Sequence, residues 1–268
     1  MLLLFLAVVY ITERSPEPAL GDSLSFSVAA LQGFDYSTNA TNHFLYINLM
    51  HLLSLITGFK YSHLAFQLLS LIPSILTLVM LSKILKQLRI EPTIRFLGMF
   101  LLGFSFTYWR HAEIIEVYAL NLLITSFAIY WFVLWHGNRR RKYLYYSSFI
   151  LGLAMLLHVQ QVLYIPFLMY WCFLAFSFNF KHWLKTFLLF ALPASFLFVP
   201  PIVFNTNTIE SIFFDNSFQD QVLGLNVQTI LKGIVKSVGL LIFNFGPLAA
   251  LLILAAFKVK TEKTLHWG

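Results

Sequence analysis

The chain has 268 residues, of which 59% are hydrophobic and only 11% are charged, and its mean hydropathy is +0.77. Soluble domains are roughly 45–50% apolar, so this composition excludes an ordinary soluble protein and indicates an integral membrane protein. The formal net charge is +7, but the basic residues stand in short groups beside apolar runs, which is typical of membrane topology and not of nucleic-acid binding. The single cysteine, Cys172, excludes an intrachain disulfide.

About eight apolar runs approach the roughly 20 residues that a helix needs to cross a bilayer. We therefore predict an all-α membrane protein, with about eight transmembrane helices in a single polytopic domain over residues 1–268. The first run is short, which suggests that the natural chain starts upstream or that this helix is incomplete. The predicted membrane segments are residues 1–12, 63–82, 96–109, 117–136, 144–160, 162–178, 186–204 and 232–257.

The charges indicate an orientation for these segments. If both termini are cytoplasmic, most of the 18 Lys and Arg residues fall in cytoplasmic loops, as the positive-inside rule requires. All Asp and Glu residues except Glu91 and Glu262 then fall on the non-cytoplasmic side. Acidic residues contribute little to topology, so either a shared site on that face or the ordinary acidity of solvated loops explains them.

The first non-cytoplasmic loop, residues 13–62, contains two candidate elements. Gly21-Asp22-Ser23 precedes a helical pattern, so Asp22 or Ser23 is either a helix cap or a functional group. An apolar stretch from Phe44 to Thr57 is interrupted by polar residues, which predicts a helix in the membrane interface or half of a re-entrant hairpin. His43 and Tyr46 stand at its start, where an interfacial role and a binding role both fit.

The stretch from Tyr108 to Asn121 concentrates charge between two apolar runs. Arg110, Glu113 and Glu116 follow at three-residue spacing, which predicts one side of a helical turn. An Arg110–Glu113 pair is the simplest interpretation, but it leaves one carboxylate over, and a ligand, a metal or His111 would explain that surplus better.

A further histidine, His158, stands beside Gln160 and Gln161 at the predicted outer end of an apolar segment. A divalent metal is a possible cofactor if these histidines and acids converge. The usual metal-binding spacings are missing from the sequence, as are the P-loop, GxSxG and GxGxxG patterns. The candidates for a metal site are Asp22, His43, Glu113, Glu116 and His158.

Taken in order, these elements resemble the multi-pass GT-C glycosyltransferases, and they are similar to the protein O-mannosyltransferase-like membrane family. The string Glu-Val-Tyr-Ala-Leu-Asn at residues 116–121 is the most specific part of the resemblance. The resemblance extends from the N-terminus to about residue 170 and rests on a short first helix, Gly21-Asp22-Ser23, the His-x-Leu-Tyr element at His43 to Tyr46, the stretch Trp109 to Asn121, and Leu151-Gly152-Leu153 leading to His158.

The resemblance implies a sugar donor on a polyprenyl phosphate or diphosphate and a reaction on the non-cytoplasmic face. It also implies that an acidic residue of the first outer loop is the catalytic base, which here is Asp22. Two positions differ from the family pattern: Ser25 stands where a second acid often follows, and residues 39–42 replace a His-Pro-Pro-Gly-like loop.

With Asp22 as the base, the remaining polar groups suit the other needs of sugar transfer. Arg110, with His111 or His158, would bind the donor phosphate. Glu113 or Glu116 would hold Arg110 in place or bind sugar hydroxyls, and His43 would also bind the substrate. Tyr46, Trp109 and Tyr118 offer flat faces for a sugar ring or the first isoprene units. For the tyrosines, a place in the aromatic belt of the membrane interface fits equally well.

The expected partners are a polyprenyl-phosphate-linked sugar, a protein or lipid acceptor and membrane lipids, without nucleic acid. Two other functions stay open: a transporter or flippase of a lipid-linked or small polar substrate, and an inactive scaffold with the same frame. A transporter would carry ionisable residues near the middle of the membrane and often paired halves, whereas the acids here gather at one face. Sugar transfer is therefore the leading interpretation.

Overall fold

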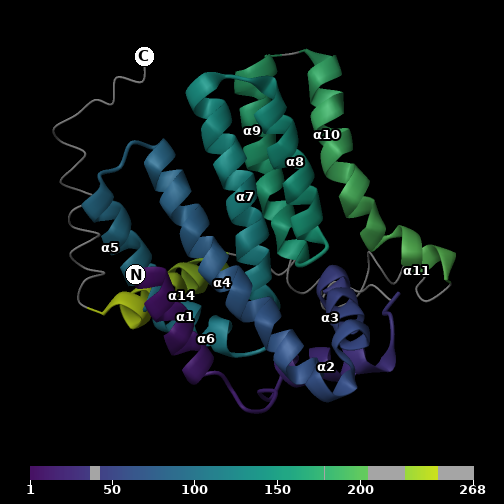
Figure 1. The fold of residues 1–268 in the computed structure, drawn as a ribbon. Helices are drawn as coiled ribbons and strands as arrows, with labels where there is room; N and C mark the ends of the chain where they lie inside the picture. Colours follow the sequence, from purple (N-terminus) through teal and green to yellow (C-terminus); the bar gives the residue numbers. More distant parts are fainter. Residues whose placement is uncertain (37–42, 178, 205–226, 247–268) are drawn as a thin grey trace.

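In the computed structural model, the chain is described for residues 1–36, 43–177, 179–204 and 227–246. These residues form α-helices and short 3₁₀ helices, and none of them lies in a strand (Figure 1). The prediction of an all-α protein is confirmed. The loop at residues 39–42, which differs from the family pattern, lies outside the described residues.

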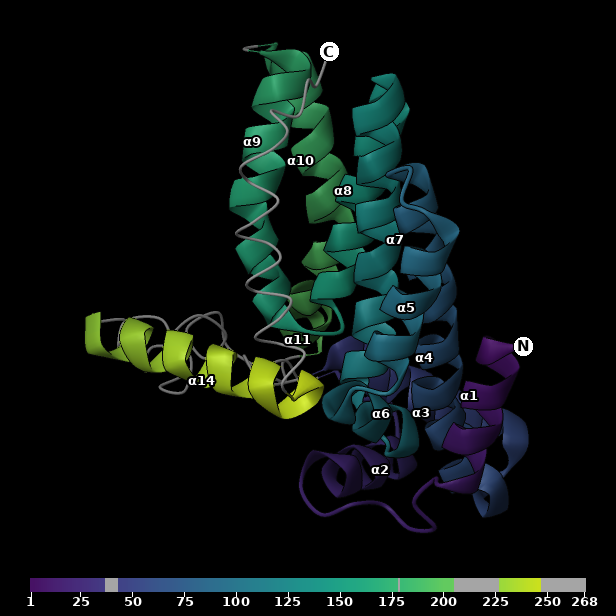
Figure 2. The same ribbon diagram turned by 90° about the vertical axis from the view of Figure 1, so that its left-hand side faces the viewer.

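The longest helices stand side by side in a bundle (Figures 1 and 2). Helix α7 packs against both α4 and α8, and α8 in turn packs against α10. Apolar side chains cover most of the surface of these helices, as expected of segments that contact lipid and one another. The bundle consists of α4 (Ser62–Gln87), α7 (Val117–Asn138), α8 (Arg141–Met155), α9 (Ile165–Phe176) and α10 (Phe180–Ala194).

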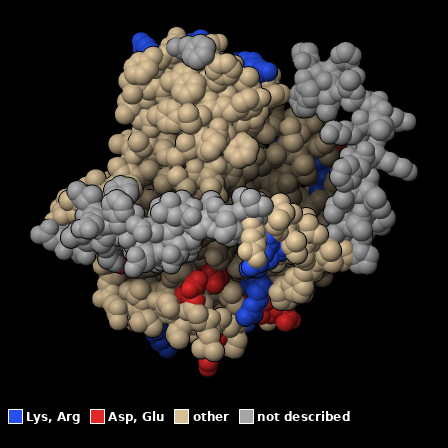
Figure 3. Space-filling model, turned by 180° about the vertical axis from the view of Figure 1, so that it is seen from behind, with Lys and Arg blue, Asp and Glu red and all other residues tan. Residues whose placement is uncertain are grey.

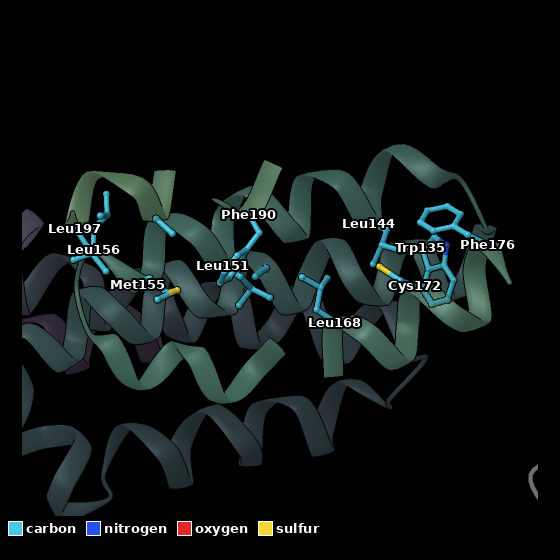
Figure 4. Packing of buried hydrophobic residues seen from close by; sticks show 12 residues of the cluster. Trp135, Leu144, Leu151, Met155, Leu156, Leu168, Cys172, Phe176, Phe190 and Leu197 are labelled. Carbon is cyan, nitrogen blue, oxygen red and sulfur yellow. The ribbon is translucent and has the colours of Figure 1, made fainter. Parts of the chain in front are cut away.

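The main hydrophobic core lies among α7, α8, α9 and α10. At one end of this core, Trp135, Leu144 and Cys172 lie together, and Leu156 and Leu197 meet at the other end (Figure 4). Trp135 and Cys172 are fully buried. This core holds the second half of the bundle together, and two smaller hydrophobic clusters lie among the short helices and the helices that they contact.

Shorter helices gather at the lower end of the bundle in Figure 1. These elements are α1 (Leu2–Thr12), α2 (Asp22–Gln32), α3 (Phe44–Thr57), α6 (Phe106–Glu113) and the 3₁₀ helix η2 (Val159–Tyr164). Helices α1, α3 and α6 contact α4, whereas α2 packs on α3 and η2 on α8 and α9, and the polar candidates of the sequence lie on these elements or beside them.

By length and composition, the described residues contain three helices able to cross a membrane: Phe59–Gln87, Val117–Asn138 and Val159–Phe176. They correspond to the predicted segments 63–82, 117–136 and 162–178. The apolar stretch at Phe44–Thr57 forms a helix of its own with the predicted bounds.

The predicted segment 96–109 is wrong as a single helix. Helix α5 (Pro92–Gly103) ends there, and α6 begins at Phe106 after Ser105, whose backbone is extended. Ser105 Oγ donates a hydrogen bond to the carbonyl oxygen of Leu102 (2.8 Å). A hydroxyl that bonds to nearby backbone in this way offers an alternative to continued helix.

Three further segments differ from their predicted bounds. Helix α8 stops at Met155 because the backbone of His158 is extended, so 144–160 is too long. Segment 186–204 is divided by its prolines into α10, the 3₁₀ helix η3 (Ser195–Leu197) and α11 (Val199–Val203). The last segment, 232–257, overlaps α14 (Val227–Phe245), which starts earlier than predicted and runs across the bundle rather than along it (Figure 2). Residues 247–257 lie outside the described residues.

Helices α8 and α10 approach each other closely at Gly152. A Cβ atom built there would lie 2.2 Å from the carbonyl oxygen of Phe190 and 2.6 Å from Cγ of Pro193. Separations this short are far inside van der Waals contact, and the nearest atom is backbone. Only glycine therefore permits this approach of the two helices.

We expect Gly152→Ala to lower the unfolding free energy by about 1–3 kcal/mol, because the methyl group must push α10 away from α8. Gly98→Ala is the matched control, since its Cβ would lie 3.5 Å from Leu85 Cδ1, an ordinary contact. Thermal unfolding of both variants in the same detergent measures the difference. Equal stabilities would show that the α8–α10 contact is looser than the structure has it.

Candidate active site

Asp22 lies at the first position of α2, with an exposed side chain. The cap position belongs to Gly21, whose φ of 92° favours glycine, and no side chain forms a capping hydrogen bond. Ser23 Oγ instead accepts the backbone N–H of Ala19 (3.2 Å), which fixes the turn before the helix. The capping interpretation of Asp22 and Ser23 is therefore wrong, and the Asp22 carboxylate is available for another role.

The helical spacing predicted for Arg110, Glu113 and Glu116 is also wrong. Arg110 and Glu113 end α6, whereas Glu116 caps α7 with an extended backbone (φ −150°, ψ 142°). The helix is interrupted between Glu113 and Glu116, where Ile114 and Ile115 are buried, at 8% and 1% exposure. The two glutamates consequently point to different surroundings.

Ser70 of α4 holds this break in place. The backbone N–H of Glu116 donates to Ser70 Oγ (3.1 Å), and Ser70 Oγ lies 3.2 Å from the Glu116 carbonyl oxygen, to which it donates in return. Buried backbone groups outside a helix need such partners. Sequence analysis missed Ser70, because a serine inside a long apolar run carries no distinguishing signal.

Glu116 and Asp22 lie close enough to influence each other. Burial, and second the Asp22 carboxylate, raise the pKa of Glu116 to about 7, although the N–H of Val117 acts in the opposite direction. Glu116 Oε2 is buried without a hydrogen-bond partner. A carboxyl that titrates near neutral pH beside an exposed carboxylate is an arrangement found in acid–base sites.

Aromatic and imidazole rings connect the elements around these acids. The ring centroids of His111 and Tyr118 are 4.9 Å apart, those of Tyr118 and His158 are 5.7 Å apart, and those of His158 and His43 are 5.0 Å apart. Asp22 lies within electrostatic range of both His43 and Tyr118. The structure thus brings together candidates from α2, α6, α7, η2 and the start of α3.

Burial keeps the histidines neutral. It is the largest cause that lowers the pKa of His43, His111 and His158, and neighbouring Arg110 lowers that of His111 further. The Asp22 carboxylate acts on His43 in the opposite direction but does not outweigh burial. A phosphate in this site would find its positive charge at Arg110, next to His111, and not at the imidazoles.

Hydrogen bonds assign different tautomers to two of these rings. His43 Nδ1 lies 2.6 Å from the carbonyl oxygen of Leu157, which only accepts, so Nδ1 carries the hydrogen and Nε2 is an acceptor. His158 Nδ1 accepts the backbone N–H of Gln160 (3.3 Å), so its Nε2 is the donor. One ring therefore offers a lone pair and the other a hydrogen.

Arg110 and Glu113 lie at the end of α6, before the interruption that separates α6 from α7. Burial raises the pKa of Glu113, and Glu13 adds to this effect while Arg110 opposes it. Arg110 itself is exposed. Glu113 accordingly faces Glu13 and Arg110, whereas Glu116 faces Asp22.

Tyr46 lies beneath the site rather than on its surface. Its exposure is 0%, and its ring meets Phe26 edge-on at 5.5 Å. Its hydroxyl forms no hydrogen bond of good geometry. The side chain supports the start of α3 but does not reach an open surface.

A cavity of about 270 Å³ adjoins this group of rings. His111 and Tyr118 line it together with hydroxyl-bearing residues of α4 and α6, apolar residues and the end of α14. Asn244 Oδ1 accepts the backbone N–H of Thr107 (2.7 Å), and Phe243 meets Phe106 edge-on at 4.9 Å, so α14 closes one side. Sequence analysis missed this role of Asn244, which stands in an apolar run.

The candidate metal ligands do not assemble into a metal centre. Among residues 1–36, 43–177, 179–204 and 227–246, no group of three His, Cys, Asp or Glu side chains could hold a metal ion. Glu113 is separated from Glu116 by the break after α6.

The raised pKa of Glu116 makes a prediction about stability. The pKa of this carboxyl is 4.5 in the unfolded chain and about 7 in the folded protein. Between these values the unfolded chain has lost the proton that the folded protein still binds. The free energy of unfolding therefore falls as the pH rises from about 4.5 to 7. Because Glu116 is only partly buried, we expect a loss of about 1–2 kcal/mol that Glu116→Gln, which mimics the protonated acid, does not show. Thermal unfolding between about pH 5 and 8.5 measures it.

Glu17→Gln is the control, because Glu17 is an exposed glutamate between α1 and α2. It should keep the wild-type pH dependence. Parallel curves for wild type and Glu116→Gln would contradict the raised pKa.

Comparison with known protein families identifies the segment that contains most of this site. Residues 36–183 match the Protein O-mannosyl-transferase TMEM260 N-terminal domain. The match includes every candidate from His43 to His158, whereas Asp22 lies before it. No curated protein and no solved structure matches the chain significantly. Because the matched segment exceeds half of its 268 residues, the chain belongs to the family of the Protein O-mannosyl-transferase TMEM260 N-terminal domain.

Proposed function

We propose that the chain is a membrane glycosyltransferase of the GT-C type, which moves a mannose-like hexose from a polyprenyl phosphate to a hydroxyl of a protein or lipid. Family membership supports sugar transfer. The observation that carries the proposal is the exposed Asp22 carboxylate beside Glu116, in a group of neutral histidines. Such a site offers a base and hydrogen-bond donors in one place.

In this proposal Asp22 is the catalytic base. It takes the proton of the acceptor hydroxyl as that oxygen forms a bond to the anomeric carbon of the sugar. The bond from this carbon to the phosphate oxygen breaks, and the lipid phosphate leaves with the electron pair. A base in hydrogen-bond reach contributes about 10²- to 10⁴-fold to such a step, and the exposed position of Asp22 permits that reach.

The leaving phosphate gathers negative charge and requires donors. Arg110 is exposed beside His111 and would supply two parallel hydrogen bonds to phosphate oxygens. His158 presents Nε2–H, while His43 presents an acceptor suited to a sugar hydroxyl. The phosphate would therefore bind toward α6 and the sugar toward Asp22.

Glu116 would order the sugar rather than act as the base. With a pKa of about 7 it carries a proton about half of the time at neutral pH, so it can donate to a sugar hydroxyl or accept from one. Tyr118, at 40% exposure, offers a ring face beside it. Tyr46 would act only by supporting these groups, and Glu113 only by holding Arg110.

We further propose that the site faces the non-cytoplasmic side, with both termini in the cytoplasm and about eight membrane helices in the full arrangement. The distribution of charge supports this orientation. In Figure 3 the acidic patches lie toward the lower end, where basic side chains stand beside them, while the charged side chains seen at the top are basic. Basic residues mark cytoplasmic ends.

We expect Asp22→Asn to reduce sugar transfer by at least about 100-fold, because an amide cannot take the acceptor proton. Transfer of radiolabelled mannose from a polyprenyl phosphate to a Ser/Thr peptide, in membranes that contain the full chain, measures it. Membrane insertion and thermal stability should not change, since the Asp22 side chain caps no helix.

Glu17→Gln is the matched control in the same loop and should retain full transfer. Full activity of Asp22→Asn would disprove the role of Asp22. Accumulation of the donor inside vesicles, without any glycosylated product, would favour a flippase instead.

A further inference from the structure

The end of the bundle opposite the carboxylates is strongly basic. The α7–α8 junction carries Arg139 to Lys142, and the start of α10 carries Lys181 and Lys185. Between Glu116 and Glu210 the sequence contains no Asp or Glu, so these helices supply no acidic partner for their cations. Unpaired cations that gather on one surface attract an anion.

A hydrogen-bond network positions part of this cluster. Arg141 Nη1 lies 2.9 Å from His182 Nε2, and the Tyr145 hydroxyl lies 2.7 Å from His182 Nδ1. Since a guanidinium only donates, His182 Nε2 accepts and Nδ1–H donates to the Tyr145 oxygen. The Tyr145 hydrogen is then free to donate elsewhere, and Lys185 Nζ lies 4.6 Å from the centre of the same ring.

An apolar groove of about 650 Å³ descends from these groups between α8 and α10. Its basic members, Lys142 and Lys185, lie near the starts of the two helices. Phe149, Ile150 and Leu189 follow farther along, and α8 and α10 run in the same direction from the basic end (Figure 1). The groove is therefore charged at one end and apolar along the rest of its length.

A second groove, of about 530 Å³, runs along α10 and shares two residues with the first, Lys185 and Leu189. Lys181 stands at its basic end, and leucines line most of the remainder. Two open apolar grooves that share one cationic end match a molecule with two hydrocarbon chains and one anionic headgroup. A small free anion would make no contact with the apolar surface of the grooves.

We propose that Lys142, Lys181 and Lys185 bind the phosphate of an anionic glycerophospholipid, whose two acyl chains lie in the grooves beside α10. The Tyr145 hydroxyl donates to the same phosphate. This site lies at the opposite end of the bundle from Asp22 and does not depend on the proposed sugar transfer. It would fix the position of α10 against α8 in the bilayer.

Native mass spectrometry of the delipidated full chain, titrated with phosphatidylglycerol, tests the proposal. Lys142→Gln/Lys185→Gln should weaken binding at least tenfold, since each lysine near an anionic headgroup contributes about fivefold. Lys83→Gln/Lys86→Gln removes the same charge from exposed positions of α4 outside the grooves, and should change binding less than twofold. Equal weakening by both pairs would overturn the proposal, as would equal affinity for phosphatidylcholine.

Leu189→Trp distinguishes a lipid from a free anion, because it places a bulkier side chain at the apolar residue that both grooves share and keeps every charge. It should abolish tight phosphatidylglycerol binding, while circular dichroism and thermal unfolding show that the helices persist. Unchanged lipid binding in this variant would overturn the proposal. So would displacement of the lipid by inorganic phosphate at equal concentration, which would indicate a small-anion site.

Discussion

The hydrogen bonds between the Ser70 hydroxyl and the backbone of Glu116 hold the most important irregularity of this fold. They secure an extended segment between α6 and α7 against the long helix α4. If the chain continued as helix here, Glu113 and Glu116 would share one side of it, as their spacing suggests. The break instead sends Glu113 toward Glu13 and Arg110, and Glu116 toward Asp22. The candidate site exists because of this separation.

The two ends of the bundle differ in the chemistry of their polar groups. The apolar core of α7 to α10 and the close approach at Gly152 hold the bundle together, and buried Ser147 and Ser148 add hydrogen bonds from α8 to α7 and α10. The lower end can then hold partly buried acids and neutral histidines, whose pKa values are shifted mainly by burial. The upper end collects cations that lack acidic partners in their own helices, which fits contact with anionic headgroups.

Apolar runs predicted the helices well where lipid or core contact decides the structure, as in α3, α4 and α7. They failed where a single polar group or proline interrupts the run, as at Ser105, His158 and Pro193, because a hydropathy pattern does not show where backbone hydrogen bonds change partner. Asp22, His43, Glu116, Tyr118 and His158 could be named from the sequence, yet Ser70 could not. Its hydroxyl acts through a contact between segments that are distant in the chain, and no local pattern reports such a contact.

The candidate site depends on Asp22 and Glu116 being neighbours. Infrared titration of the Glu116 carboxyl band, identified by its loss in Glu116→Gln, tests it most directly. In wild type the band should titrate near pH 7, and in Asp22→Asn the pKa of Glu116 should fall, because the neighbouring negative charge is gone. An unchanged pKa in Asp22→Asn would show that the two carboxyl groups are not neighbours and would contradict the account.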